Sequence, residues 1–251
     1  MHNAAALALG LDRVYVAHRV ATAALPKAIA GLAALGFDGA NVTVPHKAAA
    51  FACCDLLSDE AAAARAVNTL CFEHGSVTGH LTDGLGLLDA VSVVPAAATI
   101  VGAGGSARAA ASALLRAGTM KITIIARNSH CRAELGAALA QIAPAAEIDA
   151  DDNAVPTPGL LVHCTPVGGI SALEELPVPA DVVSRMTAVA DFAYRADGSE
   201  TPLVAAARAQ GIATIDGLEL LVRQGARSFT LWTGIAAPLD VMRRAVAAPV
   251  A

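Results

Sequence analysis

Apolar and polar positions along this chain repeat with two different periods, and each change of period predicts a new element. Apolar residues at every third or fourth position predict helices at 1–11, 22–36, 46–57, 106–117, 201–211 and 218–234, with one more after 127. Alternating or β-branched runs predict strands at 13–20, 41–44, 66–73, 98–102, 121–127, 159–165, 186–194 and 211–217. Strands that alternate with helices indicate right-handed crossovers and a parallel sheet, so the predicted fold class is α/β.

Regular strand–helix units begin only after Asp83, and the chain before that point mixes shorter elements. With 251 residues, the chain can form one large domain or two modest ones. We therefore expect two α/β units, with the boundary near residues 84–88.

The stretch NVTVPHK places several polar side chains at the end of a predicted strand. Its two valines face one side of the strand, and Asn41 and Thr43 face the other. Pro45 cannot continue a strand ladder, so Lys47 begins the next element. Open α/β sheets bind ligands at such strand ends, which makes these polar residues candidates for a site. The alternative is a solvated lysine at the start of a helix.

The stretch TIVGAGGSARAA is the strongest local signal in the sequence. A β-branched strand runs into Gly102-x-Gly104-x-x-Ala107 and then into a helix, which is the required context of a dinucleotide-binding turn. Gly102 permits the tight turn, Gly104 lets backbone amides approach a pyrophosphate, and Ala107 lets the helix pack close to the strand. The alternative is a tight turn with a purely structural role.

The end of the next strand indicates which dinucleotide is preferred. An NAD site usually has an acidic residue there for the ribose 2′-hydroxyl, but this sequence has Arg127. A guanidinium matches the charge and geometry of a 2′-phosphate, so NADP is favoured. The alternative is an exposed arginine that happens to follow a strand.

Charge and cysteine content exclude several classes of protein. A formal net charge of −5 and a pI near 5.8 argue against a nucleic-acid binder, which needs a basic face. The five cysteines lack any Cys-x-x-Cys spacing, so we expect reduced thiols in a cytoplasmic protein, with no disulfide framework and no metal site. The charge-free run 90–107 contains Pro95 and three glycines, so we expect a buried strand and turn rather than a membrane span, and we expect no signal peptide.

Lys47, Asn68 and Asp83 each lie at a predicted strand end before the nucleotide-binding unit. Hydride transfer at a secondary alcohol needs a proton acceptor near the hydroxyl group, and a lysine oriented by a carboxylate can serve. Lys47 and Asp83 are therefore the candidate pair.

With these residues the sequence resembles the shikimate dehydrogenase family. The resemblance runs from Met1 to about Pro238 and includes, in order, NVTVPHK, AVNTL, TDG, GAGGSARA, ARN, TPVG, DFAY, TPL and DGLELLVRQGARSF. It implies a cytoplasmic, NADP-dependent oxidoreductase that reversibly reduces 3-dehydroshikimate to shikimate in the chorismate branch of aromatic amino-acid biosynthesis. It also implies a substrate-binding domain at 1–84, completed by helices at 217–251, and a Rossmann-type NADP-binding domain at 85–216.

The resemblance assigns roles to individual positions of this sequence. The implied catalytic pair is Lys47 and Asp83, and the implied substrate-binding residues are Asn41, Thr43, Asn68, Tyr194 and Gln224. The implied cofactor-binding residues are Gly102, Ala103, Gly104, Gly105, Ser106, Ala107, Arg127, Asn128, Thr165, Pro166 and Gly217. The implied partners are the small-molecule substrate and NADP, and the expected assembly is a monomer or a homodimer.

The sequence differs from the family pattern in three respects. The family has a strand and a Ser-x-Ser-Pro turn before the helix that begins this sequence, and that strand would belong inside the sheet of the substrate domain. Leu81 replaces an asparagine beside Asp83, and Cys131 precedes Arg132 where the family has its second NADP-binding arginine. These differences leave open a related enzyme that acts on quinate or an aminoshikimate, or a nucleotide-binding homologue without activity.

Overall fold

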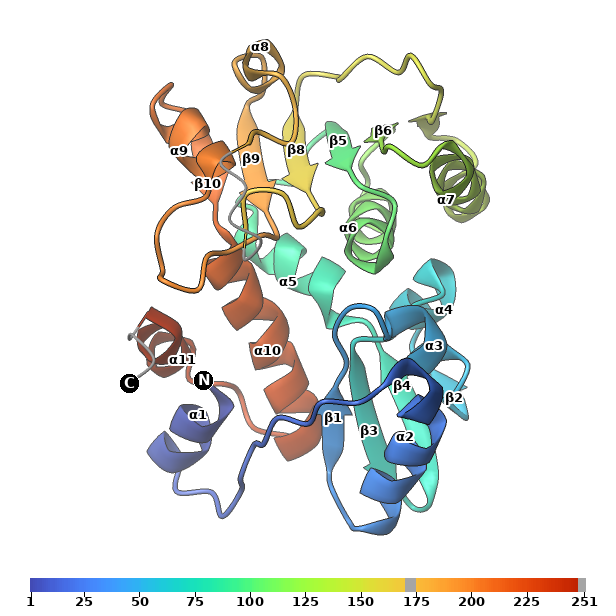
Figure 1. The fold of residues 1–251 in the computed structure, drawn as a ribbon, viewed down its shortest axis with the longest axis vertical. Coiled ribbons are helices and arrows are strands. Elements are labelled where there is room, and N and C mark those ends of the chain that lie inside the picture. The colour runs from blue at the N-terminus through green and yellow to red at the C-terminus, as the bar shows by residue number, and fades with distance from the viewer. Residues whose placement is uncertain (170–174, 248–251) are drawn as a thin grey trace.

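The computed structural model describes residues 1–169 and 175–247, which form two sheets (Figure 1). Helices α5 (Thr82–Ala90) and α10 (Gly217–Thr233) pack against each other between these sheets. Both ends of the described chain lie on the same side of the molecule, where α1 (His2–Ala8) contacts α11 (Leu239–Ala247).

The smaller sheet is mixed rather than parallel. Its strands in spatial order are β1 (Gly39–Asn41), β3 (Thr69–Glu73), β4 (Ser76–His80) and β2 (Leu56–Leu57). β3 pairs antiparallel with both β1 and β4, and β2 pairs parallel with β4. The β3–β4 turn uses His74 and Gly75 at φ 50° and 81°, the positive values that a tight two-residue hairpin requires.

The larger sheet is fully parallel and has the strand order of a dinucleotide-binding fold. Its strands in spatial order are β10 (Ala213–Ile215), β9 (Ala188–Asp191), β8 (Leu160–His163), β5 (Ala97–Val101), β6 (Lys121–Ile125) and β7 (Glu147–Asp149). The chain order reverses between β5 and β8, which creates a crevice at their carboxyl ends. The predicted α/β class is confirmed, and the glycine turn lies at this crevice.

The remaining helices surround the two sheets (Figure 1). They are η1 (Thr22–Ala24), α2 (Leu25–Ala34), α3 (Lys47–Phe51), α4 (Asp59–Ala64), α6 (Gly105–Arg116), α7 (Ser129–Ile142), α8 (Ala180–Val183) and α9 (Pro202–Arg208). Alternate residues of β8 enter different cores: Leu160 and Val162 face the cluster that includes residues of α6 and α7, and Leu161 faces the cluster that includes residues of α8 and α9. The parallel sheet is therefore covered on both faces, as its continuous apolar strands require.

Three predictions about the first unit are wrong. Residues 13–20 form no strand, and β1 at the edge of the smaller sheet pairs only with β3. The predicted strand at 41–44 ends at Asn41, before a turn that precedes Lys47. The predicted helix 46–57 ends at Phe51, and its last two residues form β2. Short elements depend on their neighbours, so the local pattern alone misassigns them.

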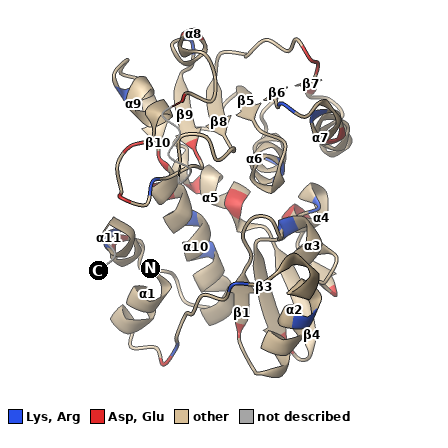
Figure 2. Ribbon diagram, in the orientation of Figure 1, with Lys and Arg blue, Asp and Glu red and all other residues tan. Residues whose placement is uncertain are grey.

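The two expected units correspond to different sheets, but α5 continues without a break across residues 84–88. The residue bounds of the two domains stay a prediction. Figure 2 shows Lys and Arg on separate elements in both halves of the molecule, intermixed with Asp and Glu.

Candidate active site

Lys47 is the first residue of α3, and the turn after β1 directs its side chain inward. Nζ donates a hydrogen bond to Oδ2 of Asp83 at 2.6 Å. The side chains are only 11% and 8% exposed, so this ion pair is largely desolvated. A buried pair of this kind is costly to break, because either charge alone would be left without a partner.

Asp83 lies in the first turn of α5, where the helix N-terminus favours a negative charge. Its second oxygen, Oδ1, accepts a hydrogen bond from Nδ2 of Asn68 at 3.0 Å. Asn68 is only 2% exposed, and the same amide nitrogen also lies 3.2 Å from Oε1 of Gln224 on α10. The structure thus brings together four predicted site residues from four parts of the chain.

A second group of hydroxyl and amide side chains continues the cluster toward the edge of the smaller sheet. Nδ2 of Asn41 lies 3.1 Å from Oγ1 of Thr69 and 2.9 Å from Oγ of Ser228. The hydroxyl of Tyr15 donates to Oδ1 of Asn41 at 3.1 Å. Asn41 is therefore held by neighbours that the sequence pattern did not single out.

The glycine turn lies directly opposite Lys47. Gly102 has φ 119°, and α6 begins at Gly105 with no side-chain cap, so its first backbone amides remain available to an anion. A Cβ on Gly104 would meet no atom within 4 Å, because the loop faces open space. This space is a cleft of about 1490 Å³ whose lining runs from Lys47 to Arg127. The glycine cradle and the cleft fit a dinucleotide.

Ser106 connects the glycine turn to the lysine. Nζ of Lys47 donates to Oγ of Ser106 at 3.1 Å, and Cδ of Lys47 lies 3.1 Å from the position of a Cβ on Gly105. The ammonium group is thus held between a carboxylate of one unit and a hydroxyl of the other. The sequence predicted Ser106 as a cofactor residue only.

Arg127 and Asn128 follow β6 and line the same cleft. The Arg127 guanidinium is exposed and has no ion-pair partner among the described residues, so it is available to a phosphate. Asn128 caps α7 by accepting from the backbone N–H of Cys131 at 2.9 Å. Arg132 is 8% exposed and donates to the carbonyls of Ala126 and Ala150, so it stabilises its own domain and does not face the cleft.

The other predicted residues divide into three groups. The cleft lining includes Ala103, Thr165 and Pro166. Ala107 is fully buried behind the turn, where a larger side chain would separate α6 from the sheet. The contacts of the described chain do not join the remaining three to Lys47 or Asp83, namely Thr43, Tyr194 and Gly217.

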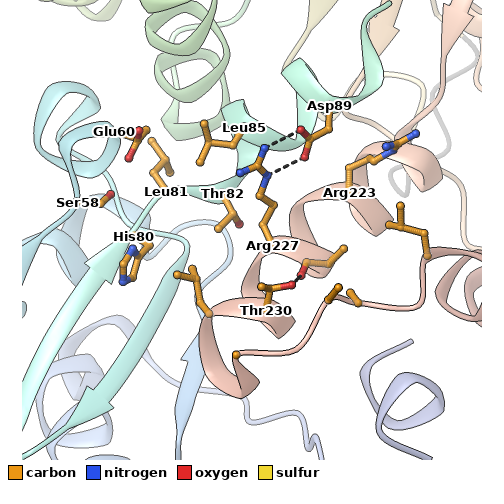
Figure 3. A pocket seen from close by; sticks show the side chains of 16 residues that line it. Ser58, Glu60, His80, Leu81, Thr82, Leu85, Asp89, Arg223, Arg227 and Thr230 are labelled. Atoms are coloured by element: carbon orange, nitrogen blue, oxygen red, sulfur yellow. Dashed lines mark hydrogen bonds and ion pairs between the residues drawn. The ribbon is translucent and has the colours of Figure 1, made fainter. Parts of the chain in front are cut away.

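Leu81, which differs from the family pattern, does not line this cleft. Its side chain is 2% exposed, packs in the core of the first unit, and borders a second cavity of about 750 Å³ (Figure 3). In that cavity, the guanidinium of Arg227 donates to both carboxylate oxygens of Asp89 at 2.6 and 2.7 Å, which ties α10 to α5.

Metal-ligating clusters and membrane-spanning helices are both missing from the described part of the chain. Within residues 1–169 and 175–247, no group of three or more His, Cys, Asp or Glu side chains could hold a metal ion. None of the described helices is long and apolar enough to cross a membrane.

Comparisons with known proteins agree with this geometry. The family described as the shikimate dehydrogenase substrate binding domain matches residues 1–70, and the shikimate 5′-dehydrogenase C-terminal domain matches residues 217–247. A shikimate dehydrogenase (NADP(+)) of Moorella thermoacetica is 41% identical over 97% of this chain and 86% of its own length.

Solved structures of the same kind are also similar. A shikimate dehydrogenase in complex with NADP+ has a TM-score of 0.86 and 33% identity, over 98% of this chain and 88% of its own. The enzyme of Thermus thermophilus, in complex with NADP(H) and shikimate, has a TM-score of 0.84 and 32% identity, over 98% of this chain and 91% of its own.

Proposed function

Because this chain belongs to the shikimate dehydrogenase family, we propose that it is an NADP-dependent oxidoreductase that interconverts shikimate and 3-dehydroshikimate. The observation that carries the proposal is the desolvated Lys47–Asp83 pair, in which Lys47 contacts the glycine turn at the edge of a cleft large enough for a dinucleotide. The fold supports the assignment of NADP as the cofactor, and the paired lysine supports the assignment of alcohol oxidation as the reaction.

Oxidation of a secondary alcohol removes a hydride from carbon and a proton from oxygen. Bound NADP+ supplies the hydride acceptor. In the direction of reduction, the Lys47 ammonium group donates a proton from Nζ to the carbonyl oxygen, and solvent then returns a proton to the amine. Oxidation is the reverse, so Lys47 first loses a proton to solvent and then accepts the hydroxyl proton at Nζ. Asp83 and Ser106 hold Nζ in place, so the proton acceptor is oriented before the reaction.

Polar side chains around the pair match a substrate with several hydroxyl groups. Asn68 and Gln224 lie in contact with each other, Asn68 also contacts the Asp83 carboxylate, and both amides carry donors and acceptors. We assign them to substrate hydroxyls, together with Asn41 and Thr43. Tyr194 is proposed to contact the substrate, and Gly217 the cofactor, from the nucleotide-binding unit.

Cofactor preference follows from Arg127. Gly102 to Ala107 hold the pyrophosphate through backbone amides, and Arg127 and Asn128 bind the adenosine 2′-phosphate end of the cleft. A guanidinium forms charge-assisted hydrogen bonds to a phosphate that NAD lacks.

A cytoplasmic location is part of this proposal, because all five cysteines are free thiols. Burial raises the pKa of Cys54 and of Cys71 to about 11, so these thiols stay protonated and unreactive at neutral pH. The assembly is proposed to be a monomer or a homodimer.

The test is NADP reduction by the purified chain with shikimate, with quinate and NAD as parallel controls. Rapid reduction of NADP with shikimate, and slow or no reduction with quinate or with NAD, supports the proposal. Faster turnover with quinate, or with NAD, would assign the chain to a related activity.

A further inference from the structure

We propose that His163 and Asp191 form a buried relay that fixes the hydroxyl group of Thr165 as a hydrogen-bond acceptor for the dinucleotide. His163 would then be a positioning residue for the cofactor, because it acts only through Thr165. The inference rests on the proposed function in one respect, that the cleft binds NADP.

The relay joins adjacent strands at the carboxyl edge of the parallel sheet. His163 ends β8 and Asp191 ends β9, and the two are register partners. Both side chains are 0% exposed, and Nδ1 lies 2.8 Å from Oδ1 of Asp191. The other ring nitrogen, Nε2, lies 2.5 Å from Oγ1 of Thr165, which lines the cleft.

The surroundings of Asp191 determine where the protons lie. Oδ1 accepts from the backbone N–H of Ala193 at 2.8 Å. Oδ2 accepts from the hydroxyl of Thr201 at 2.5 Å, and that hydroxyl itself accepts from the N–H of Val204, so its own proton points to Asp191. The carboxylate is therefore an acceptor throughout, and Nδ1 of His163 must donate to it.

In the proposed relay the His163 imidazole is neutral and donates from Nδ1, so Nε2 carries only a lone pair. The Thr165 hydroxyl must donate its single proton to that lone pair, so its oxygen presents only lone pairs elsewhere. One of them faces the distant N–H of Val167 at 3.4 Å. The other is left for a ligand, and the ligand group that fits it is an N–H or O–H donor.

The position of Thr165 indicates that this N–H or O–H donor belongs to the dinucleotide. Cγ2 of Thr165 lies 3.3 Å from the position of a Cβ on Gly102, so the side chain borders the glycine turn itself. A buried carboxylate and imidazole are costly in an otherwise apolar strand pair, and a simple Leu or Val pair would hold β8 to β9 at lower cost. The relay thus does more than join two strands.

The test is a thermodynamic cycle of NADP affinity, measured by titration calorimetry without substrate. Thr165→Val and His163→Phe should each weaken NADP binding about fivefold, the size of one hydrogen bond. The double variant should bind no more weakly than Thr165→Val alone, because both changes remove the same contact. His163→Gln keeps a donor and an acceptor, and should restore affinity to within about twofold of the original chain.

A second measurement keeps the inference testable if His163→Phe does not fold. Nitrogen-15 NMR of the original chain should show His163 protonated at Nδ1 and bare at Nε2. The other tautomer, a doubly protonated ring, additive losses in the cycle, or unchanged affinity of Thr165→Val would each overturn the relay. If the original chain binds NADP but does not oxidise shikimate, the proposed reaction is refuted, and the thermodynamic cycle of NADP affinity still tests the relay.

Discussion

Replacing Gly86 with alanine should force α5 away from α10 and weaken both the fold and the substrate site. A Cβ on Gly86 would lie 2.7 Å from the backbone nitrogen of Gln224, 3.0 Å from its Cα and 3.2 Å from the carbonyl carbon of Arg223. All three atoms are backbone, so no side chain can rotate away, and the helices must separate. Overpacking of this kind costs about 1–3 kcal/mol.

The helix propensity of alanine opposes that cost by up to about 1 kcal/mol. Gly31→Ala is the matched control, because Gly31 lies inside α2 and its Cβ would meet no atom within 4 Å. The free energy of unfolding, measured by denaturant titration, should therefore be about 1–3 kcal/mol lower for Gly86→Ala than for Gly31→Ala.

The same displacement moves Gln224, which contacts Asn68 in the candidate site. The KM for shikimate should rise in Gly86→Ala, and the NADP dissociation constant should stay within about twofold of the original because the glycine turn lies elsewhere. Equal stability of the two variants, or an unchanged KM, would refute the argument that the close approach of α5 to α10 at Gly86 positions the substrate site.

Three further predictions test single contacts. Arg127→Ala should weaken NADP binding by about 1.5–3 kcal/mol and barely change NAD binding, whereas the exposed Arg185→Ala should change neither; equal losses for NADP and NAD would contradict the 2′-phosphate assignment. Ser106→Ala should lower kcat about fivefold with NADP affinity unchanged, because Lys47 loses one of its two partners, and an unaltered kcat would exclude this role. Hydrogen bonds from Arg243 lower the pKa of Glu219 to about 2, from an ordinary value of 4.5, so its contribution to stability is complete above about pH 4.5 and is lost as the pH falls through 2. Since the carboxylate is partly exposed, Glu219→Gln should destabilise the chain by about 1 kcal/mol at pH 7 in thermal unfolding, and a deficit that persists at pH 2 would refute the ion-pair explanation.

Five strands of the larger sheet were predictable, because β5, β6, β8, β9 and β10 are mostly apolar and each precedes a helix. The edge strand β7 was not predicted, because its sequence Glu-Ile-Asp is short and acidic. The glycine turn was also predictable, because its function depends on backbone conformation at a few adjacent residues. The smaller sheet was less predictable. Residues 13–20 alternate like a strand, but a strand needs a neighbour, and none pairs with them.

In the candidate site, the residues within recognisable motifs could be predicted, but many of their partners could not. Thr69 and Ser228 lie in two of the quoted motifs, 159 positions apart, yet nothing in either motif indicates that their hydroxyls lie 2.7 Å apart. His163 lies in an apolar strand, where a single histidine suggests a core position until Asp191 is placed beside it. The structure supplies those long-range contacts.

The central claim is that Lys47 transfers the substrate proton, and the most direct measurement compares Lys47→Ala with Lys27→Ala. Lys27 is exposed on α2 and serves as the control for loss of a lysine. With shikimate and NADP, kcat of Lys47→Ala should fall by at least about 100-fold, the contribution of general acid–base catalysis, while NADP affinity stays close to that of Lys27→Ala. The unfolding temperature should fall below that of Lys27→Ala, because Asp83 is left buried without its cationic partner. A Lys47→Ala variant that folds, binds NADP and retains its turnover would contradict the account.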